Sequence, residues 1–164
     1  MAIRRKLCWI CGQRLDPTFA FVLGPMCMVN RVNAEPPNHL DCARFAAMAC
    51  PFLTKPRMKR NERDVPDEAQ DMPGLAIKRN PGCCVVWLTN GYSLFDAGNG
   101  QLFEIGKPLA IEFYAEGRKA TREEVLESIR TGLPILREVA EQDGREAVAE
   151  LEQAAARAVA LVPA

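Results

Sequence analysis

The chain has 164 residues, of which 48% are hydrophobic and 26% are charged, and its formal net charge is zero. This composition provides enough apolar material for a packed core, and it excludes a wholly disordered or a collagen-like chain. The longest apolar runs are far shorter than the ~20 residues that cross a bilayer, so we expect no membrane span.

The first residues are basic but lack the apolar segment of a secretory signal. We therefore expect a cytoplasmic protein whose seven cysteines are reduced thiols.

The zero net charge hides an uneven distribution. Residues 1–63 contain eleven Lys or Arg and four Asp or Glu, which gives +7, and the remainder therefore carries −7. This division predicts two regions with different surroundings, or two halves that attract each other.

The first elements follow a Cys-Trp-Ile-Cys-Gly segment that begins at Cys8. β-forming residues predict a strand over 18–23, and the turn Gly24-Pro25 predicts that 26–29 returns as a second short strand. A helix is then expected from 39 to about 49, capped by Asn38.

The next segment, 54–74, is basic and contains prolines, which predicts a linker or arm between a region 1–53 and a region 75–164. Its cations, with Arg31, are the candidate nucleic-acid-binding residues: Arg31, Lys55, Arg57, Lys59, Arg60 and Arg63. Aromatic residues do not alternate with the charges of this arm, so we expect no stacking surface for single strands there.

Short runs of β-forming residues separated by turn dipeptides predict an antiparallel meander of four or five strands over about 75–114. Asn90-Gly91, between 83–89 and 92–96, is the strongest hairpin signal. The expected core residues of this region are Trp87, Phe95, Phe103, Leu109, Ile111 and Phe113.

Helices are expected in the last part of the chain. Thr121 and Glu124 form a capping-box pattern for a helix to about 130, which should end at Thr131-Gly132, before a new helix starting near Pro134. Asp143-Gly144 should separate this helix from a final one, whose apolar stripe should pack on the sheet or on a neighbouring helix. The predicted strands and helices together indicate an α+β fold.

Four residues have the spacing of zinc ligands. Cys8 and Cys11 flank a tight turn, and His39, the one histidine of the chain, precedes Cys42 by three residues at an expected helix start. Three thiolates and one imidazole close the coordination sphere of one structural zinc ion. Cys27 or Cys50 could replace one of these ligands, and Cys8 with Cys11 could instead be a redox dithiol.

The arrangement of a Cys-x-x-Cys turn, a hairpin and a ligand-bearing helix over about 7–50 resembles the treble-clef zinc finger. Several segments also resemble a family of uncharacterised phage and bacterial (prophage) proteins. These segments are 24–31, 35–37, His39, Cys42-Ala43, 50–53, 116–121 and Glu124-Val125. The family resemblance implies a phage or mobile-element setting and brings no activity.

Enzymatic chemistry is not expected. The histidine is used by zinc, which leaves no imidazole to activate water in a zinc-scaffolded nuclease, no His-x-Glu deaminase pattern, and no Ser-His-Asp or Cys-His set. The expected function is a zinc-stabilised, non-enzymatic binding protein that acts on a host protein or on nucleic acid, with no small-molecule substrate. The alternative is a nucleic-acid-binding regulator that uses the basic first third.

Overall fold

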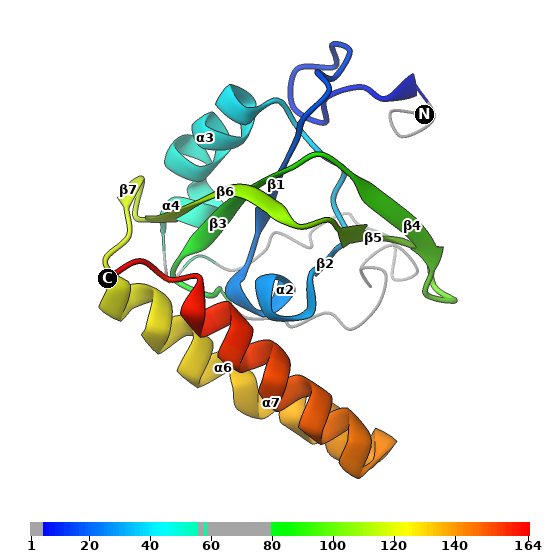
Figure 1. Ribbon diagram of the computed structural model, residues 1–164. Coiled ribbons are helices and arrows are strands. Elements are labelled where there is room, and N and C mark those ends of the chain that lie inside the picture. The colour runs from blue at the N-terminus through cyan, green and yellow to red at the C-terminus, as the bar shows by residue number, and fades with distance from the viewer. Residues whose placement is uncertain (1–4, 56–57, 59–79) are drawn as a thin grey trace.

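The computed structural model describes residues 5–55, 58 and 80–164, which form two antiparallel sheets with helices around them (Figure 1). The four-stranded sheet has the order β1-β3-β6-β7, and the three-stranded sheet has the order β2-β5-β4. The strands are β1 (Phe19–Leu23), β2 (Val32–Asn33), β3 (Cys84–Thr89), β4 (Tyr92–Asp96), β5 (Gln101–Ile105), β6 (Pro108–Ala115) and β7 (Arg118–Lys119). The α+β class with C-terminal helices is therefore confirmed.

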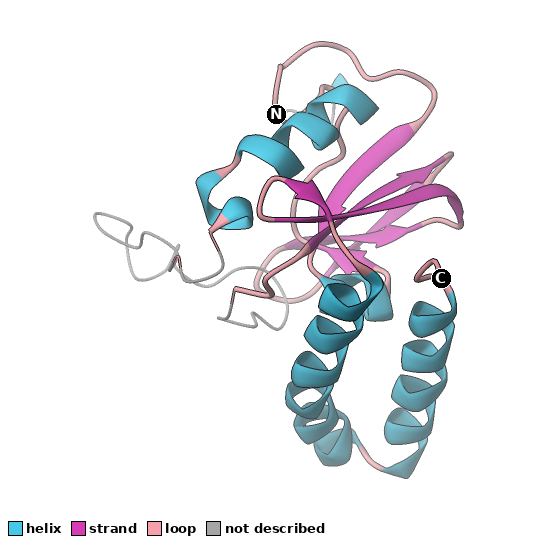
Figure 2. Ribbon diagram, turned by 90° about the vertical axis from the view of Figure 1, so that its left-hand side faces the viewer, coloured by secondary structure: helices cyan, strands magenta, loops and turns pink. Residues whose placement is uncertain are grey.

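Helices cover both faces of the four-stranded sheet (Figure 2). The helices are α2 (Pro25–Asn30), α3 (Leu40–Ala49), α4 (Pro51–Thr54), α6 (Arg122–Asp143) and α7 (Arg145–Ala160). On one face, Ala43 and Ala47 of α3 pack against Val86 of β3. On the other face, α2, α6 and α7 pack against Phe21 and Trp87. This alternation follows from the two-residue period of a strand, and it explains why β3 is apolar on both faces.

The expected division into regions 1–53 and 75–164 does not divide the sheets. β1 pairs with β3 from Phe19↔Thr89 to Leu23↔Val85, and β2 pairs with β5. Two strands from the first region are thus hydrogen bonded to strands of the second, so the described residues of both regions share their sheets.

The expected strand at 26–29 is wrong, because these residues belong to α2. Pro25 occupies the first turn of this helix, where its fixed φ and missing N–H are tolerated. Met28 and Val29 then bury their side chains in the core shared with α6 and α7. β1 has its partner in β3, so the sequence following it does not return as a hairpin.

The expected meander is wrong in its strand order. The hairpin over 92–96 and 101–105 is present, as β4 with β5. Asn90-Gly91, however, leads the chain from one sheet into the other, and β3 pairs with β6 instead of β4. The Gly91 carbonyl accepts a hydrogen bond from the Gly106 amide at 3.0 Å. This bond attaches the connection between β3 and β4 to the connection between β5 and β6, and no hairpin forms between β3 and β4. The strand expected at 75–79 lies outside the described residues.

Three of the expected core aromatic residues are buried: Trp87, Phe103 and Phe113. Ile111 is partly buried against the same cluster. Phe95 and Leu109 are instead exposed, at 42% and 53%. β4 lies at the edge of its sheet, and Leu109 precedes the part of β6 that the helices cover, so neither side chain meets a packed layer.

The C-terminal helices agree in part with the sequence pattern. The capping box is confirmed: the Thr121 hydroxyl accepts from the Glu124 amide, and the Glu124 carboxylate accepts from the Thr121 amide. The expected break at Thr131-Gly132 is wrong, because α6 continues through Pro134 with Gly132 and Leu136 buried on the same side. Gly144 separates α6 from α7 as expected. None of the helices in the described part of the chain is long and apolar enough to cross a membrane.

An ion-pair network fixes α3 to the sheet. Arg44 of α3 donates to the Glu112 carboxylate of β6 from Nε at 3.1 Å, and Lys119 of β7 donates to it at 2.8 Å. These partners, with Arg44 as the largest contributor, lower the pKa of Glu112 to about 2. The network joins a cation of the basic first third to an acid of the remainder, as the mutual-attraction interpretation of the charge distribution requires.

We predict that Gly117→Ala destabilises the protein more than Gly98→Ala does. Both glycines have positive φ, +77° and +86°, so alanine is strained at either position by roughly 1–2 kcal/mol. At Gly117, between β6 and β7, a Cβ would also lie 2.9 Å from the Met48 carbonyl oxygen of α3, whereas the space at Gly98 is open. Urea unfolding of the two variants measures the difference, and equal losses of unfolding free energy would contradict the contact with α3.

Candidate metal centre

The first two cysteines lie on a closed loop. The Cys8 amide donates to the Gln13 carbonyl at 2.7 Å, and the Gly12 amide donates to the Cys8 carbonyl at 2.9 Å. A β-bridge between Leu7 and Arg14 joins the arms of the loop. Gly12 has φ +71°, a conformation that glycine adopts without strain. The backbone therefore turns around the Cys8 and Cys11 sulfurs.

The second pair of candidate ligands is held against β1. Asn38 and Ala20 exchange two backbone hydrogen bonds, at 2.7 and 2.9 Å. Asn38 is therefore a bridge residue and not the helix cap that its side chain suggested. The N-cap position of α3 is taken by His39, and Cys42 lies in the first turn.

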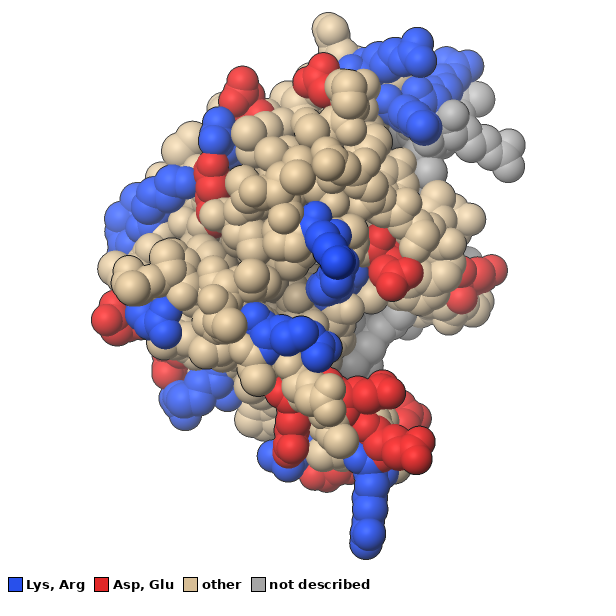
Figure 3. Space-filling model, in the orientation of Figure 1, with Lys and Arg blue, Asp and Glu red and all other residues tan. Residues whose placement is uncertain are grey.

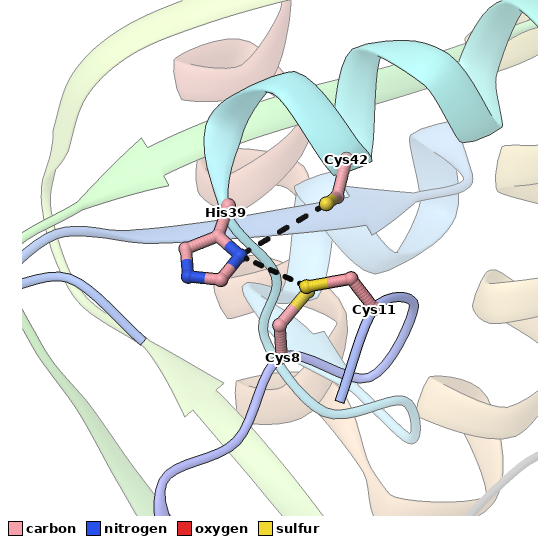
Figure 4. Close-up of side chains that lie close together, drawn as sticks. All are labelled: Cys8, Cys11, His39 and Cys42. Atoms are coloured by element: carbon pink, nitrogen blue, oxygen red, sulfur yellow. Dashed lines mark hydrogen bonds between the residues drawn. The ribbon is translucent and has the colours of Figure 1, made fainter. Parts of the chain in front are cut away.

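The four side chains meet at one point (Figure 4). The His39 Nδ1 atom lies 3.4 Å from the Cys11 Sγ and 3.9 Å from the Cys42 Sγ, and all four potential ligand atoms lie within 4.8 Å of one another. Zinc–sulfur bonds of about 2.3 Å and a zinc–nitrogen bond of about 2.0 Å at tetrahedral angles give ligand–ligand distances of roughly 3.5–3.8 Å. The cluster of Cys8, Cys11, His39 and Cys42 can hold a metal ion and is compatible with zinc.

The orientation of the imidazole is fixed from the side away from the sulfurs. The His39 Nε2 atom lies 2.9 Å from the Arg14 carbonyl oxygen. A carbonyl only accepts hydrogen bonds, so Nε2 carries a proton, and Nδ1 is the nitrogen that faces the sulfurs and can bind a metal. Metal-binding histidines in proteins are oriented by such second hydrogen bonds.

The thiol pKa values show why this cluster favours a cation. Burial alone would raise the pKa of Cys8, but the backbone amides of Cys11, His39 and Ile10 lower it to about 6. Burial, together with the neighbouring Cys8 and Cys11 sulfurs, raises the pKa of Cys42 to about 12. Without a cation, the sulfurs cannot all be thiolates at neutral pH, and a divalent ion removes this conflict.

The surroundings of the imidazole favour its protonated form. The Arg14 carbonyl, followed by the Cys11 and Cys8 sulfurs, raises the pKa of His39 to about 9, although burial opposes this. In the metal-free protein, both ring nitrogens therefore carry a proton at neutral pH, and a metal ion displaces the proton on Nδ1.

Neither alternative cysteine ligand belongs to the cluster that the described residues form. Cys27 is on α2 at the core, where burial raises the pKa of its thiol. Cys50 lies at the junction of α3 and α4, beyond the turn that carries Cys42.

Two of the candidate nucleic-acid-binding cations, Arg31 and Lys55, belong to the described residues, and neither is part of the metal cluster. Arg31 donates from Nε and Nη2 to the Ile105 carbonyl, at 3.1 and 2.6 Å, and so fastens the end of α2 to β5. Lys55 is exposed at the end of α4. Arg57, Lys59, Arg60 and Arg63 lie outside the described residues.

Trp9 and Ile10, which lie between the two cysteines of the loop, are not among the site residues predicted from the sequence. In the structure they are among the exposed large hydrophobic residues, at 56% and 41%. Their place in a Cys-x-x-Cys turn was the available signal, because a backbone that wraps around two sulfurs leaves the intervening side chains outside.

Comparison of the chain with family models, with curated proteins and with solved structures finds no match.

We predict that Cys42→Ser lowers metal retention sharply and that Cys50→Ser leaves it unchanged. Cys42 provides one of the four ligand atoms, whereas Cys50 lies outside the cluster. Elemental analysis of the purified variants measures the metal content per chain. Full metal content in Cys42→Ser would show that another residue completes the site.

Proposed function

We propose that this protein is a zinc-stabilised, non-enzymatic binding protein of a phage or mobile-element kind that acts on a host protein or on nucleic acid. The observation that carries the proposal is the donor set: three cysteine sulfurs and one imidazole nitrogen already provide four ligands. Tetrahedral zinc with four protein ligands keeps no position for water or substrate, which is the arrangement of structural sites.

The proposed resemblance to the treble-clef zinc finger is limited to two of its parts. The Cys-x-x-Cys turn and the ligand-bearing helix α3 support it. The strand expected between them at 26–29 is part of α2, so the hairpin of that comparison does not form from these residues.

The position of the centre supports a structural role. The metal cluster joins the loop around Cys8 to the start of α3, and the Trp9 amide donates to the Pro37 carbonyl at 3.3 Å beside it. Zinc there would hold together an exposed loop that has few buried side chains of its own, and structural zinc sites contribute folding free energy in this way.

Metal removal tests this structural role. We predict that chelation removes amide-exchange protection from the loop around Cys8 and from the start of α3, while the amides of β1 stay protected. β1 is held by hydrogen bonds to β3 and by the core on both faces, none of which involves the metal. Unchanged protection of the Cys8 amide after chelation would contradict a structural metal.

A closed coordination sphere also makes a spectroscopic prediction. In the cobalt-substituted protein, small ligands such as azide or imidazole should leave the visible absorption bands unchanged, because no coordination position is open. Cobalt bands that shift as azide is titrated would indicate an open position and would contradict the non-enzymatic proposal.

A nucleic-acid-binding regulator is the second candidate, and the exposed cations Arg5, Lys6 and Arg14 on the metal-binding loop favour it.

A further inference from the structure

The tip of the metal-binding loop exposes large apolar side chains. Trp9 is 56% exposed, whereas the other tryptophan of the chain, Trp87, is 1% exposed. Trp9 and Ile10 lie between two candidate ligands, so a bound metal would fix the backbone that carries them. An indole ring gains free energy when it leaves water, and a fixed, exposed ring therefore indicates a binding surface.

Basic residues flank this tip. Arg5 and Lys6 precede the loop and Arg14 follows it, and all three side chains are exposed. The Leu15 amide donates to the Lys6 carbonyl at 2.9 Å, which holds the two arms of the loop side by side. Figure 3 shows Lys and Arg side chains gathered over this N-terminal end of the molecule, at the upper right.

These cations are available to a ligand. Among the residues that the structure describes, the ion pairs join other side chains, and none includes Arg5, Lys6 or Arg14. Asp16 is the one acidic residue among residues 5–16. The surface thus combines an exposed indole with an excess of positive charge.

A hollow continues the surface beyond the loop. Lys6 lines it together with Phe19, Gly91 and Tyr92, and its volume is about 310 Å³. The Phe19 and Tyr92 rings meet edge to face, with their centroids 5.0 Å apart. Lys6 therefore lines a hollow with aromatic surface and also belongs to the segment that leads into the loop carrying Trp9.

We propose that the zinc-loop surface, defined as Arg5, Lys6, Trp9, Ile10 and Arg14, binds single-stranded nucleic acid. An unpaired base stacks on Trp9, and the cations contact the adjacent phosphates. A purely acidic peptide would satisfy the cations without covering the indole, and a duplex keeps its bases stacked on each other. A single strand uses both features, as single strands do on other basic surfaces with aromatic side chains. This inference rests on the proposed binding function and names its ligand.

The two tryptophans provide the readout. Titration of the zinc-loaded protein with oligothymidylate at low salt should quench the emission of the exposed Trp9, while the emission of buried Trp87 stays unchanged. A duplex of the same length should quench little. The Trp9→Phe variant, which leaves Trp87 as the emitter, should lose the quenching but retain most of the affinity.

Affinity is measured with a labelled oligothymidylate by fluorescence anisotropy. Trp9→Ala should weaken binding about 5-fold to 150-fold, the range expected for loss of one stacked base. Phe95→Ala, which removes an exposed aromatic side chain on β4, is the matched control and should change nothing. Lys6→Ala and Arg14→Ala should each lower the salt dependence of log K by about 0.7. Zinc content is measured for every variant, so that loss of the metal is not mistaken for loss of the surface.

Two results would overturn this inference: no oligothymidylate or oligouridylate binding at low salt, or Trp9→Ala binding as tightly as the parent. If the first result is accompanied by retention of a host protein that Trp9→Ala abolishes, the surface binds a protein, and the proposed binding function stands. Cobalt bands that shift with azide would instead remove the proposed function, whatever the oligonucleotide result.

Discussion

The antiparallel pairing of β1 with β3 is the interaction on which the rest of the structure depends. It makes the segment before residue 55 part of the same sheet as the segment after residue 80. The metal-binding loop leads into one end of β1, and α2 leaves from the other. Because β1 buries Ala20 under α3 and Phe21 under the opposite helices, its position fixes where both helical layers meet the sheet.

The metal cluster could be predicted from the sequence because its information is local. Two cysteines three residues apart need a tight turn, and a histidine three residues before a cysteine places both on one side of a helix start. The fold only had to bring these two pairs together, which the hydrogen bonds of Asn38 with Ala20 and of the Trp9 amide with the Pro37 carbonyl do. The same turn indicates that the Trp9 side chain points away from the sulfurs, but whether another segment covers the indole depends on the rest of the fold, which the turn does not determine.

The errors in the fold prediction have one physical cause: contacts between distant parts of the chain override the local preference of a segment. The run at 26–29 is short and apolar, so its periodicity does not distinguish a strand from a helix, and burial of Met28 among α6 and α7 decides it. Asn90-Gly91 has the local preference for a hairpin, but β3 pairs with β1 and β6, and both of its edges are occupied. Pro134 has a local cost within a helix, and the buried contacts of Gly132 and Leu136 on either side outweigh it.

The Asn38–Ala20 bridge has a consequence for the order in which the chain assembles. The metal cluster closes a loop of modest length, since Cys11 and His39 are 28 residues apart, whereas β1 must find β3 across a much longer stretch of chain. Closing the shorter loop costs less chain entropy. A metal ion captured early would bring Asn38 to Ala20 and so hold β1 extended, with its other edge open, before β3 arrives. Contacts between residues distant in sequence limit the rate at which a sheet forms. By positioning β1 in advance, the ion would speed the pairing of β1 with β3, although it contacts neither strand.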